Sequence, residues 1–272
     1  MAKIHPTAIV SDNAKLADSV EVGPYAIIGD HVTIGPNTKV GEFVTIKGHT
    51  TIGAGNIFHK GTSIGEPAQD VNFDNWDGKI FIGDNNTFRE NCTVHLPSRK
   101  ENTTTIGSGG YFMVNAHVAH DCVVGNGVFF INNCCIGGYV QVGNGAYISA
   151  ASNIVQWLRM GDLAILGADS KASQDIPPYV MATGTTAVAH GLNLIGMKRA
   201  GFSKEEISAI KEAFKLLYLS KLSVKNALKA IEEDLFSKYA SHAAALEKLT
   251  YFVEFIRESK KGIISYSEKH KE

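Results

Sequence analysis

Residues 111–148 read YFMVNAHVAHDCVVGNGVFFINNCCIGGYVQVGNGAYI. An apolar side chain returns at every sixth position, namely Phe112, Val118, Val124, Phe130, Ile136, Val142 and Ile148. The same phase runs from Ile4 to Leu166, where 26 of 28 positions are apolar when Trp76 is counted. Composition alone would give about 12. Only Asp70 and Lys100 break the pattern. Because neither an α-helix nor an ordinary strand has a period of six, the pattern predicts a hexapeptide-repeat parallel β-helix.

The residues that flank the apolar positions fit such a coil. The residue two places earlier is often small, as at Ala26 and Ala116, which is expected if both positions point inward from a short strand. Gly often follows the apolar residue, as at Gly23 and Gly143, and allows a corner there. Three cysteines occupy the inward small position, Cys92, Cys122 and Cys134. We therefore expect them to pack in the core rather than to form disulfides or bind metal.

The pattern predicts two domains, a β-helix over residues 1–186 and an α-helical domain over residues 187–272. Segments 66–79 and 96–104 are polar and leave the six-residue phase, so we expect loops that extend from the coil.

Beyond the coil, Ser203 is followed by two acidic residues and an apolar pattern at helical spacing, which is typical of a helix N-terminus. Further helices are expected at about 223–236 and 241–258.

The composition excludes several classes of protein. With 44% hydrophobic residues and a net charge of −1, the chain should fold. It lacks the overall positive charge that would attract nucleic acid. It contains no run of about 18 apolar residues and starts without a signal-peptide pattern, so we expect a cytoplasmic protein. From residue 191 onward, 15 Lys and Arg exceed 11 Asp and Glu, whereas the preceding part is acidic. This indicates an acidic partner, although a solvated helix face would have the same pattern.

Two histidines and an aspartate surround Val118. His117 and His120 fall on positions that should project outward from the coil, and Asp121 follows His120 directly. A base oriented by a neighbouring carboxylate is typical of acyl-transfer chemistry. Two alternatives are a solvated surface histidine and a zinc site formed by His95, His117 and His120 between subunits, as in γ-class carbonic anhydrases. No Walker or Rossmann fingerprint occurs.

Further motifs accompany this pair. They are Ile64-Gly65-Glu66 with Gln69-Asp70, Asn115-Ala116-His117-Val118-Ala119-His120-Asp121-Cys122, Gln174-Asp175-Ile176-Pro177-Pro178-Tyr179-Val180, and Gly191-Leu192-Asn193 leading to Lys198-Arg199 and Gly201-Phe202-Ser203. In order and spacing, over nearly the whole chain, they resemble the UDP-N-acetylglucosamine O-acyltransferases of lipid A biosynthesis.

The resemblance implies a left-handed β-helix, a homotrimer with active sites between subunits, and no cofactor or metal. It implies transfer of a (3-hydroxy)acyl chain from acyl carrier protein to the 3-position of a UDP-amino sugar. The basic helices, with Lys211 as an example, would face the acidic carrier.

The same resemblance implies roles for individual residues. His120 matches the general base, Asp121 its partner, and the Gly138 N–H the donor to the oxyanion. The residues that match substrate contacts are Gln69, Asp70, His95, His117, Tyr139, Gln156, Asn193 and Arg199. Met113 and Ala168 match positions that set acyl-chain length, and the methyl group of Ala168 favours a shorter chain.

Five positions depart from the family's pattern: Asn72, Tyr139, Val155, Ile195 and Ala200. Tyr139 and Val155 each stand where the family usually has histidine. All five match sugar or nucleotide contacts, so the acceptor could differ, for example by a 3-amino group. Three alternatives follow: a diverged paralogue with another nucleotide sugar, one with another acyl donor such as a coenzyme A thioester, or a trimer that binds sugar nucleotides without turnover.

Overall fold

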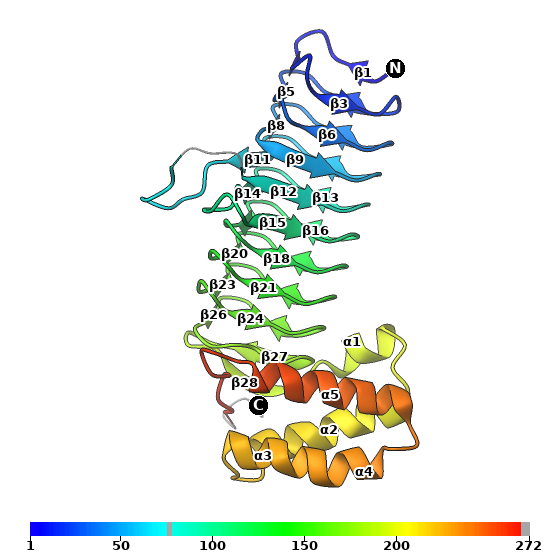
Figure 1. Cartoon of the computed structure of the whole chain (residues 1–272), viewed down its shortest axis with the longest axis vertical. Coiled ribbons are helices and arrows are strands. Elements are labelled where there is room, and N and C mark those ends of the chain that lie inside the picture. Colours follow the sequence, from blue (N-terminus) through cyan, green and yellow to red (C-terminus); the bar gives the residue numbers. More distant parts are fainter. Residues whose placement is uncertain (75–77, 268–272) are drawn as a thin grey trace.

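The six-residue period folds as a coil in which each step supplies a short strand and a turn (Figure 1). Three steps complete one coil, so residues 18 apart are hydrogen-bonded neighbours, as in the pairs Phe112 with Phe130 and His117 with Cys135. The structure is a computed structural model and describes residues 1–74 and 78–267. Trp76, which the repeat pattern counted as apolar, lies outside the described residues.

Three sheets form the sides of the coil in the described part of the chain. The 11-stranded sheet contains β1 (Lys3–Ile4), β4 (Glu21–Val22), β7 (Lys39–Val40), β10 (Ile57–Phe58), β13 (Thr87–Phe88), β16 (Tyr111–Phe112), β19 (Phe129–Phe130), β22 (Tyr147–Ile148), β25 (Ile165–Leu166), β27 (Val180–Thr183) and β28 (Val188–Leu192). The nine-stranded sheet contains β2 (Ile9–Val10), β5 (Ile27–Ile28), β8 (Thr45–Ile46), β11 (Ser63–Glu66), β14 (Thr93–His95), β17 (His117–Val118), β20 (Cys135–Ile136), β23 (Asn153–Ile154) and β26 (Lys171–Ala172). The eight-stranded sheet contains β3 (Lys15–Leu16), β6 (Thr33–Ile34), β9 (His49–Ile52), β12 (Lys79–Ile82), β15 (Thr103–Ile106), β18 (Val123–Val124), β21 (Gln141–Val142) and β24 (Arg159–Met160).

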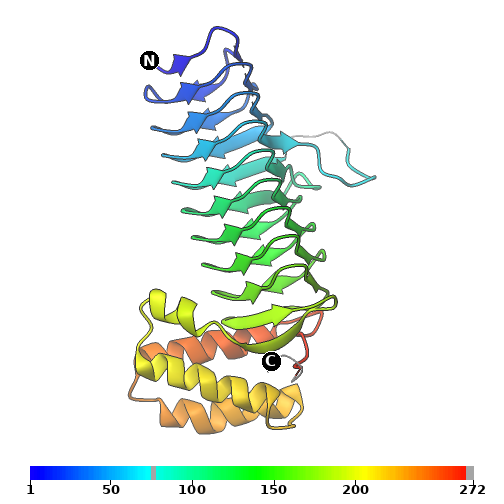
Figure 2. The same cartoon turned by 180° about the vertical axis from the view of Figure 1, so that it is seen from behind.

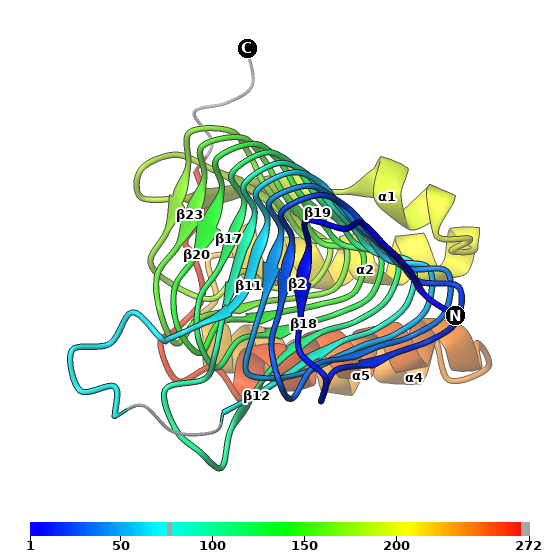
Figure 3. The same ribbon diagram turned by 90° about the horizontal axis from the view of Figure 1, so that it is seen from above.

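From β1 to β26 the chain visits these sheets in a constant order. Viewed from the N-terminal end, it turns counterclockwise as it moves away from the viewer, which makes the coil a left-handed β-helix (Figure 3). Among the described strands, those of successive coils pair in parallel, and only β28 returns antiparallel to β27. The predicted left-handed parallel β-helix is therefore confirmed.

The interior of the coil is filled by the residues that set the period. Phe58, Phe88, Phe112 and Phe130 stack in one column, with ring centroids 4.5 to 5.0 Å apart. All four are almost fully buried. The three cysteines at the inward small position, Cys92, Cys122 and Cys134, are also buried, as predicted for core packing.

Two loops leave the coil where the period is interrupted. The first follows β11 and extends well away from the sheets (Figures 1 and 3). The second occupies residues 96–102 between β14 and β15 and stays close to the coil. Both leave from the corner between the nine-stranded and eight-stranded sheets, so they border the same part of the surface.

The C-terminal helices pack beneath the last coil (Figure 2). They are α1 (Leu194–Arg199), α2 (Lys204–Tyr218), α3 (Val224–Ala230), the π-helical turn η1 (Ile231–Leu235), α4 (Phe236–Lys238) and α5 (Ala243–Arg257). Ser203 caps α2 in a capping box with Glu206, as the sequence predicts. The short helix α1 was not predicted. Within the described ranges, none of the helices has the length and apolar character needed to cross a bilayer.

Polar and aromatic contacts dock the helices on the coil. The Tyr251 hydroxyl on α5 donates to Asp162 Oδ1 at 3.1 Å, and the Ser259 hydroxyl donates to Asp175 Oδ2 at 2.7 Å. The Arg159 guanidinium lies 4.2 Å from the centre of the Phe255 ring. The last coil and α5 are therefore joined at several points.

The stacked phenylalanines give a test of the coil's stability. Replacing Phe88, which is fully buried, by Ala should lower the free energy of unfolding by about 3–5 kcal/mol because it leaves a cavity in the column. Guanidinium denaturation measures this change. Phe43→Ala is the matched control, because Phe43 lies exposed on a corner. Equal losses in the two variants would contradict the role given to the column.

Candidate active site

A pocket of about 590 Å³ lies at the corner from which both loops leave. It is lined by Gln69, Asp70, Val71, Asn72, Ser98, Arg99, His120, Tyr139, Gln156 and Trp157. Five of the predicted site residues therefore meet here, although they span almost 90 positions of sequence. The 18-residue coil explains part of this meeting, because His120 and Gln156 are two coils apart at equivalent positions.

His120 and Asp121 form a hydrogen-bonded pair at the edge of the pocket. His120 Nδ1 lies 2.7 Å from Asp121 Oδ2, and Asp121 has a left-handed backbone conformation with φ of 60°. An ionised carboxylate only accepts hydrogen bonds, so it fixes the proton of the neutral imidazole on Nδ1 and leaves the Nε2 lone pair free. The pair thus has the arrangement of a base and the group that orients it.

The sequence predicts that His117 and His120 project outward, and the structure adds a correction for His120. Its side chain does lie outside the coil interior, but it is only 11% exposed and that of Asp121 only 1%. Neighbouring groups on the next coil and the loop 96–102 cover the pair. A surface histidine freely surrounded by solvent is therefore wrong for His120.

The Asp121 carboxylate is held by the loop 96–102. It accepts hydrogen bonds from the Ser98 backbone N–H at 2.8 Å, the Ser98 hydroxyl at 2.7 Å and the Asn102 side-chain amide at 2.8 Å. Burial by itself would raise the pKa of Asp121, but hydrogen bonds from His120, Ser98 and Asn102 hold it below its ordinary value. The carboxylate therefore stays charged near neutral pH and keeps a fixed orientation.

Sequence reasoning did not identify Ser98 or Asn102. Both lie on a loop that has left the six-residue phase, so the repeat does not place them. The only available signal was the loop itself, whose position beside the coil depends on these hydrogen bonds.

Gly138 lies against the His120 ring, one coil further along the chain. A Cβ atom at this position would come within 2.3 Å of His120 Cε1, so only glycine leaves room for the imidazole. The Gly138 carbonyl accepts a hydrogen bond from Trp157 N–H at 3.0 Å. Its own N–H has no acceptor among the residues that the structure describes. This donor therefore remains available beside the base.

Two aromatic rings form one wall of the pocket. Tyr139 and Trp157 stack with centroids 3.6 Å apart and planes 7° from parallel. The Tyr139 ring also meets His120 edge-on at 5.5 Å. Trp157 was not predicted, although its position 18 residues after Tyr139 at the same corner was a usable signal.

His95 and His117 lie next to the pocket on the nine-stranded sheet. Their rings meet edge-on with centroids 5.0 Å apart, and His117 Nδ1 bonds Thr93 Oγ1 at 2.7 Å. Burial lowers the pKa of both, that of His117 to about 4, so they are neutral at pH 7. Within residues 1–74 and 78–267, no group of three or more His, Cys, Asp or Glu side chains could hold a metal ion.

Four of the predicted site residues lie elsewhere in the chain. Asn193 and Arg199 line a second pocket, of about 800 Å³, formed by α1 and the outer face of the 11-stranded sheet. Asn193 caps α1, because its side-chain oxygen accepts a hydrogen bond from the Gly196 N–H at 2.8 Å. Its side-chain amide donates to the Leu163 carbonyl, also at 2.8 Å. Met113 and Ala168 lie at the corner between the 11-stranded and nine-stranded sheets. None of the four lines the pocket of His120 in a single chain.

Four of the five departing positions line one of these two pockets. Asn72 and Tyr139 line the pocket of His120, whereas Ile195 and Ala200 line the second one. Val155 is 36% exposed on the coil surface.

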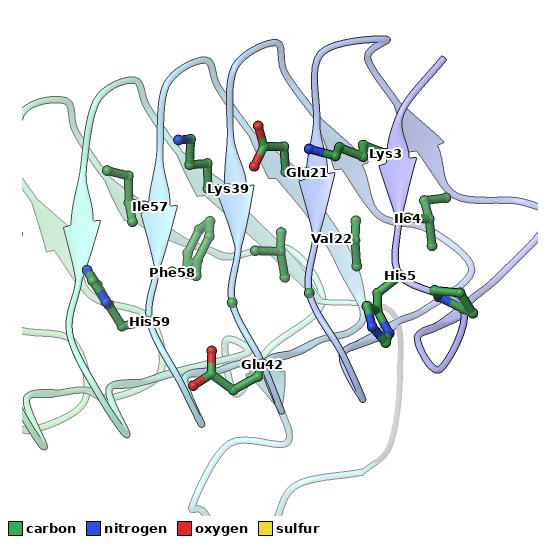
Figure 4. Close-up of a pocket in the computed structure, with 14 residues that line it drawn as sticks. Lys3, Ile4, His5, Glu21, Val22, Lys39, Glu42, Ile57, Phe58 and His59 are labelled. Atoms are coloured by element: carbon green, nitrogen blue, oxygen red, sulfur yellow. The ribbon is translucent and has the colours of Figure 1, made fainter.

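A further pocket, of about 520 Å³, lies at the other end of the coil on the outer face of the 11-stranded sheet. Figure 4 shows Lys3, Glu21 and Lys39, whose charges alternate in sign, along one row, with His5 and His59 in a second row. None of the predicted site residues lies there, and we assign it no chemistry.

The lowered pKa of His117 predicts a pH-dependent stability. Below pH 6.5 the unfolded chain binds a proton at this histidine, but the folded chain does not until about pH 4. Stability should therefore fall by on the order of 3 kcal/mol as the pH drops through this window. Denaturant unfolding of His117→Asn should show a flatter dependence. His5→Asn, at an exposed position, should behave like the unchanged chain. Parallel curves for His117→Asn and the unchanged chain would contradict the prediction.

Comparisons with known proteins show which family the chain is similar to. A family model described as Udp N-acetylglucosamine O-acyltransferase, Domain 2, matches residues 175–264. The chain is 42% identical to an acyl-[acyl-carrier-protein]--UDP-N-acetylglucosamine O-acyltransferase from Paraburkholderia phymatum, covering 97% of this chain and 100% of the relative. It is 43% identical to a protein of the same name from Myxococcus xanthus, covering 97% and 99%.

Solved structures are similar over the same extent. The UDP-N-acetylglucosamine acyltransferase of Francisella novicida superimposes with a TM-score of 0.90 at 33% identity, covering 97% of this chain and 95% of that one. Since curated relatives at more than 40% identity span nearly the full length, this chain belongs to the acyl-[acyl-carrier-protein]--UDP-N-acetylglucosamine O-acyltransferase family.

Proposed function

We propose that this acyltransferase moves an acyl chain from acyl carrier protein to the 3-hydroxyl of UDP-N-acetylglucosamine, the first step of lipid A synthesis. One observation carries the proposal: the His120–Asp121 pair faces a pocket beside the free N–H of Gly138. A base and an oxyanion donor on either side of one point are what attack of a hydroxyl on a thioester requires.

The reaction follows from the positions of these groups. His120 Nε2 removes the proton of the sugar hydroxyl while the hydroxyl oxygen bonds to the thioester carbon. The carbonyl oxygen becomes an oxyanion and accepts a hydrogen bond from Gly138 N–H. When the carbon–sulfur bond breaks, the thiolate leaves and takes the proton back from His120. Asp121 stabilises the imidazolium that forms between these steps.

The rim of the pocket supplies groups that suit a sugar. Gln69 and Gln156 carry amides, which donate and accept hydrogen bonds, and Asp70 carries a carboxylate. The Asn72 backbone N–H donates to Asp70 Oδ1 at 2.9 Å and orients this carboxylate. We assign these residues to the hydroxyl and acetamido groups of the acceptor. Because Asn72 and Tyr139 depart from the family's pattern here, a UDP-sugar with a 3-amino group should be tested as an acceptor beside UDP-N-acetylglucosamine.

We also propose that the enzyme is a homotrimer in which Asn193 and Arg199 of one subunit complete the pocket of the next. The support is their position over the 11-stranded sheet, away from His120 in their own chain. The basic C-terminal helices, with Lys211 on α2, would receive the acidic carrier protein. The acyl-length roles of Met113 and Ala168 and the cytoplasmic location remain predictions.

Replacing the base gives the first test. His120→Ala should lower kcat by about 10²–10⁴-fold, because the sugar hydroxyl then loses its proton acceptor. The measurement is steady-state transfer from acyl carrier protein to UDP-N-acetylglucosamine, with circular dichroism to check the fold. His5→Ala, an exposed histidine on the first coil, should retain full activity. A His120→Ala enzyme that keeps more than a tenth of the activity would rule out the proposed base.

Gly138 gives a second test. In Gly138→Ala the new methyl group would collide with the imidazole, so the ring must move away from the oxyanion donor. We expect kcat to fall by about 10²–10³-fold, while binding of the acceptor changes little. Calorimetric titration with UDP-N-acetylglucosamine measures the binding. Gly191→Ala is the control, because a Cβ atom there meets nothing within 4 Å. Full activity in Gly138→Ala would contradict the close packing of this glycine against His120.

A further inference from the structure

The hydroxyl of Tyr139 points to the loop 96–102. Its oxygen lies 2.7 Å from Ser98 Oγ. The ring is held between Trp157, which stacks on its face, and His120, which it meets edge-on. The tyrosine is therefore oriented by its ring contacts, and its polar group meets a loop side chain.

The direction of the hydrogen bonds follows from the chemistry of the acceptor. Asp121 Oδ2 lies 2.7 Å from Ser98 Oγ, and an ionised carboxylate only accepts hydrogen bonds. The single hydroxyl hydrogen of Ser98 is thus donated to Asp121. Tyr139 must then donate its own hydrogen to the Ser98 oxygen. The result is a directed chain from Tyr139 through Ser98 to Asp121, whose carboxylate also binds His120.

We propose that Tyr139 is a positioning residue that acts through Ser98 to hold the Asp121 carboxylate, and through it His120, in the orientation required for catalysis. This inference rests on the proposed function. Since the Tyr139 hydroxyl is already bonded to Ser98, we assign it to turnover, in place of the sugar contact that the family resemblance implies for this position.

The loop depends on few other contacts. Its middle is polar and charged, and Ser98, Arg99 and Lys100 bury little apolar surface. Leu96 and Pro97, at its start, are its buried apolar residues. Its attachment near the pair consists of the Ser98 backbone and hydroxyl bonds and the Asn102 amide bond. Donation from Tyr139 strengthens the Ser98 bond, because a hydroxyl that accepts a hydrogen bond becomes a better donor.

A set of conservative variants tests the proposal. Tyr139→Phe keeps the ring and removes only the hydroxyl, and Ser98→Ala removes the intermediate link. We expect kcat to fall about 3-fold to 10-fold in each, with the KM for UDP-N-acetylglucosamine within about 2-fold. The double variant should be no slower than Ser98→Ala, because Tyr139 acts through Ser98. Ser98→Thr retains a hydroxyl and should restore most of kcat.

Tyr25→Phe is the matched control. Tyr25 also lies on a coil corner with a positive φ, 58°, and it stacks on Phe43 at 5.1 Å. Its hydroxyl is far along the coil from the pocket, so kcat and KM should not change. A raised KM with an unchanged kcat in Tyr139→Phe would overturn the proposal and indicate a substrate contact. Multiplying effects in the double variant would also overturn it.

Hydrogen exchange supplies a readout that does not need catalysis. The Ser98 amide donates to Asp121 Oδ2, so its protection reports whether the loop is attached to the carboxylate. We expect this amide to exchange several-fold faster in Tyr139→Phe, and at its original rate in Tyr25→Phe. Unchanged exchange in Tyr139→Phe would overturn the proposal even in an inactive protein. Absence of acyl transfer by the unchanged enzyme would instead count against the proposed function.

Discussion

The hydrogen bonds between successive coils fix the site, because they place residues 18 apart in the same column. Tyr139 N–H donates to the His120 carbonyl, and Trp157 N–H donates to the Gly138 carbonyl, each at 3.0 Å. These main-chain bonds place the glycine against the imidazole and stack the two aromatic rings. A shift of one residue in the register would separate the His120 imidazole from the Gly138 N–H. The catalytic geometry therefore depends on the same repeat that fills the core.

The repeat supplies a rigid frame, and the two loops supply polar contacts that the frame lacks. The coil places His120, Gly138 and Gln156. The first loop adds Gln69 and Asp70 at the rim of the pocket, and the second adds hydrogen bonds to the Asp121 carboxylate. On such a frame, the residues of the coil are well ordered, and the loop residues at the rim of the pocket can vary more freely. Of the two departing residues in this pocket, Asn72 lies on the first loop and Tyr139 lies on the coil, next to the catalytic pair.

Much of this arrangement could be predicted from the sequence, because the period of six is a local property. It places the buried residues, the strand order and the column that holds His120. Ser98 and Asn102 could not be predicted, since their positions depend on how a loop outside the repeat folds back on Asp121. The covering of His120 was missed for the same reason. Helix α1 is short and depends on its Asn193 cap and on packing against the coil, which six residues of sequence do not reveal.

The central claim is that the sugar hydroxyl to be acylated lies beside His120. A crystal structure of the enzyme with bound UDP-N-acetylglucosamine tests it most directly. The account predicts the 3-hydroxyl oxygen within hydrogen-bonding distance of His120 Nε2, with the sugar in contact with Asp70 and Gln156. A sugar ring bound outside this pocket, or one with its 3-hydroxyl turned away from His120, would contradict it.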